Sequence, residues 1–213
     1  GYRQILERIK GFIAAGETYQ VNYTFRLHSK QKEDPLILFR QLMMIQPAGY
    51  ASYVETDQFA ICSASPELFF NLDDHQLITR PMKGTATRGL TLSADQEQSN
   101  RLQNSLKDRA ENLMIVDMMR NDLGRISSPG SIKVPKLFEV EKYPTVWQMT
   151  STISSQTQAS FSEILTALFP SASITGAPKV QTMKIITDLE NNFNRSTLDL
   201  YDSKNQKTVL RFY

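Results

Sequence analysis

Four short segments between residues 50 and 79 have the composition of β-strands and follow one another without a helical segment between them. They cover residues 50–54, 58–63, 68–72 and 76–79, with turns at Asp57 and at Asp73-Asp74. Predicted helices precede and follow this block, so strands and helices do not alternate strictly along the chain. This order favours an α+β fold with largely antiparallel sheets over a parallel βαβ architecture.

Helical spacing of apolar residues and capping signals predict the remaining elements. Helices are expected at 2–13, ending at Gly16, at 35–43, at 99–119, at 160–169 and from Pro178 onward. The predicted buried stripe of the helix at 99–119 consists of Leu102, Leu106, Ala110 and Leu113. Further strands are expected at 19–27, where apolar and polar residues alternate, at 131–134 and at 145–153.

The bulk composition excludes several classes of protein. With 24 Lys and Arg against 22 Asp and Glu, the formal net charge is +2, so neither a nucleic-acid nor a membrane-surface partner is expected. Cys62 is the single cysteine and lies in an apolar run, which predicts a small buried residue and fits a reducing, cytoplasmic location. No apolar stretch is long enough to cross a bilayer. The first residues already have a helical pattern, so we expect the sequence to begin inside a longer protein.

A carboxylate and a lysine stand beside rigid turn residues. Glu67 follows Pro66 at the entrance of a predicted strand, where it can act as a general acid or base or be a solvated turn residue. Lys83 lies in a predicted turn stiffened by Pro81 and Gly84. A lysine in a dry site can act as a nucleophile, whereas most surface lysines have no such role. From the residues alone, both alternatives stay open.

Two further segments have the composition of binding sites. Asp108 and Glu111 are three residues apart and are predicted to share a helix face opposite the Leu102 and Leu106 stripe. Such a pair suits Mg²⁺, which prefers oxygen ligands, or forms an exposed charged face. Residues 175–179 are predicted to open the last helix with free backbone N–H groups, which would bind a carboxylate. Many helices begin with similar residues, so this pattern is weak by itself.

Six segments, in this order, resemble the chorismate-utilising family, which includes anthranilate, aminodeoxychorismate, isochorismate and salicylate synthases. They are residues 16–22, 65–69, 80–85, 108–117, 120–125 and 175–179. The resemblance runs from about residue 2 to Glu190. It implies an α+β sandwich of the anthranilate synthase component I type, with largely antiparallel sheets and helices on the outside. It also implies one catalytic domain over residues 1–213, without the N-terminal subdomain of many members, and chorismate with Mg²⁺ between two sheets.

The resemblance also implies roles for individual residues. Lys83 would attack the substrate ring and form a covalent adduct, and Glu67 would be the general acid or base. The substrate-binding residues would be Thr175, Gly176, Ala177, Gln148 and Thr85. Glu111, with Asp108 nearby, would hold part of the Mg²⁺ shell.

Three positions distinguish the branches of the family. Gln20 stands where the water-adding members have a lysine, and glutamine cannot act as a base. Lys83 stands where anthranilate synthases usually have alanine, and Gln148 where they have histidine. The resemblance therefore favours amination of chorismate to 4-amino-4-deoxychorismate, with ammonia from a glutamine amidotransferase subunit. The alternatives are anthranilate synthase component I and a non-catalytic chorismate-binding subunit.

The resemblance stops after Glu190. The family continues with two strands, a glycine-rich loop and an acidic helix that supplies a second pair of metal-binding carboxylates, whereas here 23 residues (191–213) remain. Their short fragments resemble parts of that region. We therefore expect residues to be missing between these fragments, and no functional residue is predicted after Glu190.

Overall fold

The computed structural model describes the chain except residues 25–26, 31–32, 46–48, 191–199, 203–206 and 211–213, and it describes only the backbone of 27–30, 200–202 and 207–210. Its contacts divide the chain into two compact units: Gly1–Val21 with Leu68–Met183, and Asn22–Glu67 with Lys184–Tyr213. The prediction of one catalytic domain over residues 1–213 stays a prediction. In the described part of the chain, no helix combines the length and the apolar character needed to cross a membrane.

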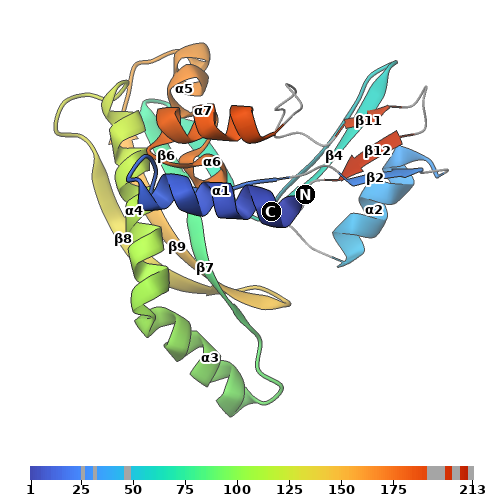
Figure 1. Cartoon of the computed structure of the whole chain (residues 1–213), viewed down its shortest axis with the longest axis horizontal. Helices are drawn as coiled ribbons and strands as arrows, with labels where there is room; N and C mark the ends of the chain where they lie inside the picture. Colours follow the sequence, from blue (N-terminus) through green and yellow to red (C-terminus); the bar gives the residue numbers. More distant parts are fainter. Residues whose placement is uncertain (25–26, 31–32, 46–48, 191–199, 203–206, 211–213) are drawn as a thin grey trace. The chain divides into compact units, whose positions relative to one another are not determined.

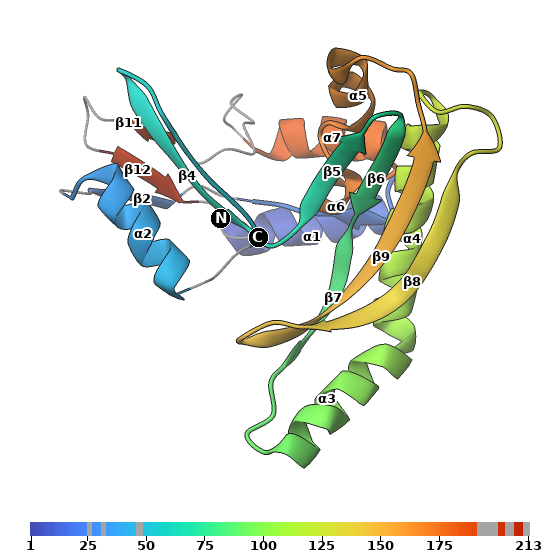
Figure 2. The same cartoon turned by 180° about the vertical axis from the view of Figure 1, so that it is seen from behind.

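The first unit is built on an antiparallel sheet centred on β9 (Val146–Gln156). Along one edge, the first half of β9 pairs with β7 (Met82–Thr87) and the second half with β6 (Gln76–Arg80), which in turn pairs with β5 (Leu68–Asp73). Pro81 separates β6 from β7, because proline has no N–H to continue a ladder. The other edge pairs with β8 (Lys133–Lys142). Figure 2 shows these strands side by side.

Two consecutive helices, α3 (Leu92–Asn104) and α4 (Leu106–Gly124), follow β7 (Figure 1). The prediction of one helix over 99–119 was wrong, because Ser105 has an extended backbone and its hydroxyl accepts the N–H of Asp108, which caps a new helix. The predicted buried stripe was also wrong apart from Leu102, since Leu106 is 85% exposed. The buried residues of α4 are Asn112, Ile115, Val116, Met119, Asp122 and Leu123.

The core of the first unit lies between α4, the sheet and α5 (Phe161–Leu168). Ile115 and Leu123 of α4, Leu77 of β6, Ile153 of β9 and Ile164 of α5 have no exposed surface and form one cluster. Burying such a side chain contributes about 1.5–3 kcal/mol. The predicted capping box of α5 is confirmed, because Ser160 and Glu163 bond to each other's backbone N–H.

The N-terminal helix and the elements around residue 176 complete the first unit. The predicted first helix is confirmed as α1 (Tyr2–Ala14), and Gly16 after it has φ +75°. The strand predicted over 19–27 is not continuous: β1 (Gln20–Val21) is followed by irregular backbone, β2 (Leu27–Lys30) belongs to the second unit, and Tyr19 is 69% exposed. The reason is that β1 pairs only with the two residues of β10 (Gly176–Ala177), which follow α6 (Ala172–Thr175) and precede α7 (Lys179–Leu189).

The second unit is an antiparallel sheet in the order β2, β12 (Lys207–Leu210), β11 (Leu200–Asp202), β4 (Phe59–Ser65) and β3 (Tyr50–Glu55). Helix α2 (Pro35–Ile45) packs on β3 and β4, as the Phe39 and Tyr53 rings show with centroids 5.6 Å apart. Cys62 is half-buried and its Sγ lies 3.5 Å from the Pro35 carbonyl oxygen, so burial raises the pKa of this thiol. The prediction of a fully buried cysteine was therefore wrong, although Cys62 packs against the start of α2.

Candidate active site

Lys83 lies in an irregular part of β7, not in the predicted turn. Met82 pairs with Thr150 and Thr85 with Gln148, so Lys83 and Gly84 together oppose Met149 and the ladder is interrupted there. Two residues opposite one is the pattern of a β-bulge, which commonly redirects a side chain. The Lys83 side chain is half-buried. The bulge therefore gives the predicted nucleophile a backbone position outside the regular ladder.

Gly84 allows helix α4 to approach this bulge closely. Its φ is +101°, which side-chain-bearing residues rarely adopt, and a Cβ at this position would lie 3.0 Å from Cβ of Asp108. Asp108 of α4 thus lies against the backbone of the residue next to Lys83, at a position that favours glycine. The absence of a side chain at position 84 therefore allows α4 to pack directly against β7.

Thr85 and Gln148 form a cross-strand pair. They are directly opposite each other in the β7–β9 ladder, and Thr85 Oγ1 donates a hydrogen bond of 3.0 Å to Gln148 Oε1. Thr85 is exposed and Gln148 half-buried, so polar groups of both residues lie at the surface of the sheet. The structure brings these two predicted substrate-binding residues together.

The two predicted metal ligands lie on the first turns of α4. Asp108 is half-buried beside Gly84 and accepts a hydrogen bond from the Ser105 hydroxyl, while Glu111 lies 3.9 Å from Lys107 Nζ. They share a helix face, but the prediction that this face lies opposite Leu102 was wrong, because Leu102 and Asp108 both approach Gly84. Among the described residues, no three His, Cys, Asp or Glu side chains are grouped to hold a metal ion. The pair can supply two oxygen ligands.

The sequence predicted that residues 175–179 open the last helix. In the structure α7 begins only at Lys179, and residues 175–177 form the end of α6 and the strand β10. Thr175 ends α6, and the Gly176 N–H donates to the Ala172 carbonyl, so this N–H is not free. The Ala177 carbonyl accepts from Thr18 Oγ1 at 2.8 Å and from the Tyr19 N–H at 2.7 Å. These bonds give a rigid, buried loop that pairs with β1.

Gly176 lets this loop touch Gln20, one of the three positions that the resemblance uses to distinguish branches. A Cβ on Gly176 would lie 2.1 Å from the Gln20 carbonyl oxygen, and the φ of this glycine is +138°. In the ladder Gln20 pairs with Ala177 and Val21 with Gly176. The first and the last of the six family-like segments are thus joined directly.

A buried ion pair anchors the other end of the same loop. Lys179 Nζ donates to Asp122 Oδ2 at 2.5 Å and to the Ala167 carbonyl at 3.2 Å, and Arg125 donates to Asp122 Oδ1 at 3.1 Å. The Asp122 side chain is 5% exposed and that of Lys179 11%. Asp122, near the end of α4, therefore fixes the start of α7.

Glu67 belongs to the second unit. It lies in the turn between β4 and β5, where its N–H donates to Ser65 Oγ at 3.3 Å and its carbonyl accepts from the same hydroxyl at 3.1 Å. The predicted position at a strand entrance is confirmed, since β5 begins at the next residue. Its role as acid or base stays a prediction.

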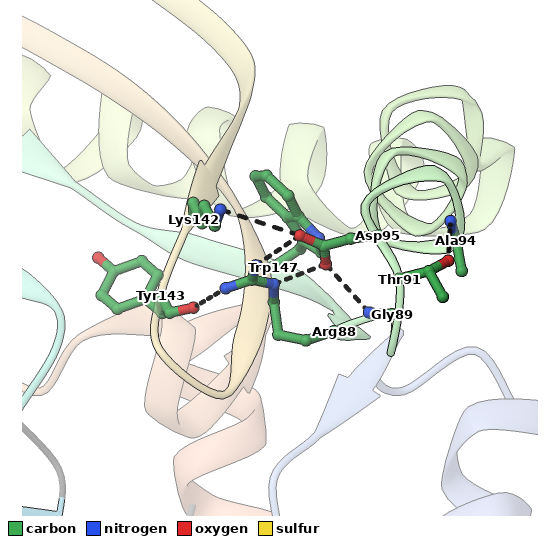
Figure 3. Close-up of polar contacts among 8 residues, drawn as sticks. All are labelled: Arg88, Gly89, Thr91, Ala94, Asp95, Lys142, Tyr143 and Trp147. Carbon is green, nitrogen blue, oxygen red and sulfur yellow. Dashed lines mark hydrogen bonds and ion pairs between the residues drawn. The ribbon is translucent and has the colours of Figure 1, made fainter.

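Sequence reasoning missed a polar cluster around Asp95, shown in Figure 3. The Arg88 guanidinium donates two hydrogen bonds of 2.6 and 2.5 Å to the Asp95 carboxylate, Trp147 Nε1 donates one of 2.8 Å, and the Gly89 N–H one of 3.0 Å. Trp147 precedes Gln148 on β9, and Arg88 follows the last residue of β7, three residues after Thr85. The cluster joins α3 to the ends of β7 and β9. No spacing pattern in the sequence relates these residues.

The Asp95 cluster predicts an acid-sensitive fold. The Arg88 guanidinium, with the Gly89 N–H and the Trp147 indole, holds the pKa of the Asp95 carboxyl well below its usual range. This stabilisation is complete above the unfolded-state pKa of about 3.9 and is lost as the pH falls below it. We therefore expect the free energy of unfolding, measured with urea from pH 7 to pH 3, to fall more steeply for the wild type than for Asp95→Asn.

Glu97→Gln is the control for this measurement, because Glu97 is an exposed carboxylate on the same helix. It should reproduce the pH dependence of the wild type. Parallel curves for wild type and Asp95→Asn would show that Asp95 does not contribute to acid sensitivity.

An open pocket of about 450 Å³ lies beside the 175–177 loop. It is lined by Tyr19, Ala110, Leu113, Met114, Asp117, Met118, Ala177 and Pro178. Its lining is mostly apolar, and of the predicted site residues only Ala177 contributes to it. The polar residues near Gly84 therefore form a different surface.

Comparison with known proteins shows which family this sequence resembles. Residues 1–196 match the family of chorismate binding enzymes. The chain is 44% identical over 191 residues to aminodeoxychorismate synthase component 1 of Escherichia coli, covering 89% of this chain and 42% of that protein. It is 34% identical over 192 residues to anthranilate synthase component 1 of Aquifex aeolicus, covering 89% and 39%. The chain thus spans less than half the length of these relatives.

A solved structure supports the same assignment. Anthranilate synthase component I from Streptococcus pneumoniae superposes with a TM-score of 0.85 at 25% identity, covering 98% of this chain and 50% of that one. This likeness confirms the predicted α+β fold of the anthranilate synthase component I type. Because the family pattern matches nearly the whole sequence and the fold agrees, this chain belongs to the chorismate-binding enzymes.

Proposed function

We propose that this chain carries the chorismate-aminating site of an aminodeoxychorismate synthase and forms 4-amino-4-deoxychorismate. The observation that carries this proposal is its identity of 44% to the E. coli aminodeoxychorismate synthase component 1, and of 40% to that of Bacillus subtilis. The anthranilate synthase of A. aeolicus is 34% identical. Lys83, Gln148 and Gln20 support the same branch, since they stand where other branches have alanine, histidine and lysine.

In this proposal Lys83 is the nucleophile. Its neutral amine forms a C–N bond to the ring, while the C–O bond of the ring hydroxyl breaks and the hydroxyl leaves as water with a proton. The family resemblance assigns the donation of that proton to Glu67. Ammonia then forms a new C–N bond as the bond to Lys83 breaks, which regenerates the lysine. A covalent intermediate replaces one difficult substitution by two easier ones.

We assign the substrate contacts to the two polar regions described above. The segment Thr175, Gly176 and Ala177 would bind a substrate carboxylate, supported by its rigidity and its contact with β1. The pair Thr85 and Gln148 would contact the ring substituents, supported by the place of Thr85 two residues after Lys83 on β7 and by its hydrogen bond to Gln148 of β9. Gln20 has no basic group, which disfavours activation of water as the nucleophile.

We further propose that the reaction uses Mg²⁺. Asp108 and Glu111 fit part of its shell, because Mg²⁺ is usually held by one or two carboxylates together with substrate oxygens and water. Asp108 is also close to the strand of Lys83, through Gly84. When bound, the ion would neutralise a substrate carboxylate and favour departure of the ring hydroxyl.

The ammonia source is the remaining part of the proposal. The name of the relatives, aminodeoxychorismate synthase component 1, indicates that they act with another component. We propose that a glutamine amidotransferase subunit supplies ammonia to this chain. When this partner is present, glutamine should support formation of aminodeoxychorismate as well as added ammonium does.

Product analysis tests the proposal. The complete protein is incubated with chorismate, ammonium and Mg²⁺, and products are separated and identified by mass. We expect aminodeoxychorismate, and we expect chelation of Mg²⁺ by EDTA to stop its formation. Without ammonium, intact-mass analysis should show a substrate adduct on Lys83. Anthranilate as the product would instead support the anthranilate synthase alternative, and absence of turnover would support a non-catalytic chorismate-binding subunit.

A further inference from the structure

We infer that Asn112 is a positioning residue for Lys83, an inference that rests on the proposed function. Asn112 is 1% exposed and lies on the buried face of α4. Its Nδ2 donates to the Lys83 carbonyl oxygen at 3.3 Å and to the Met149 carbonyl oxygen at 3.4 Å. One side chain thus connects α4, β7 and β9 at the residue that we propose as nucleophile.

The interrupted ladder explains why this bond matters. In a regular strand, backbone partners fix the orientation of each residue. At the bulge, Lys83 and Gly84 face the single residue Met149, so regular pairing with β9 is lost. The Asn112 amide lies at this point and bonds to both strands. A side-chain group thereby contributes to holding the Lys83 backbone at the point where the ladder is interrupted.

The surroundings of Asn112 fix which way its amide points. The Lys83 and Met149 carbonyl oxygens only accept, so the side-chain nitrogen must face them. The Ser151 hydroxyl donates to Asn112 Oδ1 at 2.5 Å and accepts from the Phe138 N–H at 3.1 Å. Every atom of this chain of bonds has a partner suited to it. A buried, satisfied polar network of this kind favours a single geometry.

Asn112 also lies next to the proposed metal ligands. It follows Glu111 directly and is four residues, about one helical turn, after Asp108. Its bonds to Lys83 and Met149 therefore set the distance between the proposed nucleophile and the proposed metal-binding turn of α4. A small shift of the Lys83 backbone would move its amine away from the ring without removing any substrate-binding group.

The test measures adduct formation separately from substrate binding. Asn112→Leu keeps a similar size but removes the amide, and Asn112→Asp replaces the donors by acceptors. Each should slow formation of the Lys83 adduct about 100-fold, since a displacement near 1 Å can have that effect, while the dissociation constant for chorismate stays unchanged. Ser151→Ala, which removes only the partner of Oδ1, should give a smaller loss in the same direction.

Gln103→Ala is the matched control, because Gln103 is an exposed amide that donates to a backbone carbonyl, that of Phe138, at 2.9 Å. It should leave adduct formation unchanged. Two results would refute the positioning role while leaving amination by the wild type intact. In the first, the Asn112 variants lose chorismate binding and adduct formation in proportion to their folded fraction. In the second, Ser151→Ala and both Asn112 variants form the adduct at the wild-type rate. If the wild type itself forms no adduct on Lys83, the proposed mechanism and this inference both fail.

Discussion

Replacing Lys83 by alanine should reduce formation of aminodeoxychorismate by about 10³-fold or more, since loss of a covalent nucleophile has cost other enzymes up to about 10⁶-fold. The physical reason is that ammonia would have to displace the ring hydroxyl in one step without the covalent intermediate. Residual turnover should shift toward direct addition of ammonia, as expected for an anthranilate synthase. The rate of product formation with saturating ammonium and chorismate measures this effect.

Lys83→Arg distinguishes a nucleophile from a fixed positive charge. Arginine keeps the charge but stays protonated in proteins, so it cannot attack the ring. It should therefore be as inactive as the alanine variant. Lys133→Ala, which removes an exposed strand lysine of β8, should behave as wild type. An arginine variant with more than half of the wild-type rate would rule out covalent catalysis by Lys83.

Asp122→Ala should cause the largest loss of stability among single changes near the site. It would leave the Lys179 ammonium, whose side chain is 11% exposed, without its carboxylate partner. Breaking a buried ion pair by removing one partner typically costs about 3–5 kcal/mol. For a chain of this size the melting temperature should fall by roughly 10 °C. Urea and thermal unfolding at pH 7 measure both quantities.

Two variants show whether burial of the pair is the cause. Asp117→Ala breaks the Asp117–Arg120 ion pair, which is also on α4 but has side chains 62% and 53% exposed, and should cost at most about 1 kcal/mol. The double variant Asp122→Leu with Lys179→Met should recover much of the lost stability, because apolar residues often replace a buried ion pair without loss. Equal losses for Asp117→Ala and Asp122→Ala would contradict this explanation.

Local patterns predicted the elements whose determinants lie within a few residues. The segments of strand-like composition at 50–79 became β3 to β6, and the capping box at Ser160 became the start of α5. The resemblance to known enzymes predicted the fold class and selected residues that the structure brings together, such as Thr85 with Gln148. Both kinds of prediction use information that lies in contiguous motifs.

The failures arose where tertiary contacts override local preference. The helix predicted over 99–119 divides at Ser105, because the serine hydroxyl caps the next helix, and the buried face changes as a result. The turn predicted at Lys83 is a strand, because β9 supplies a partner 63 residues away for Thr85. Asn112 could have been recognised from its spacing of three to Ile115 and of four to Val116, which places it on their buried face.

The bond between Thr18 and Ala177 has a consequence for how the protein is made. The two residues are 159 positions apart, and Thr18 also contacts Thr182 with oxygens 2.7 Å apart. At ordinary rates of translation the ribosome needs roughly 8–30 s to add that many residues. Throughout this interval the backbone of Gln20 and Val21 has no Gly176 or Ala177 to pair with. The loop that we propose as the carboxylate site therefore cannot pair with β1 until residues 176 and 177 have been synthesised.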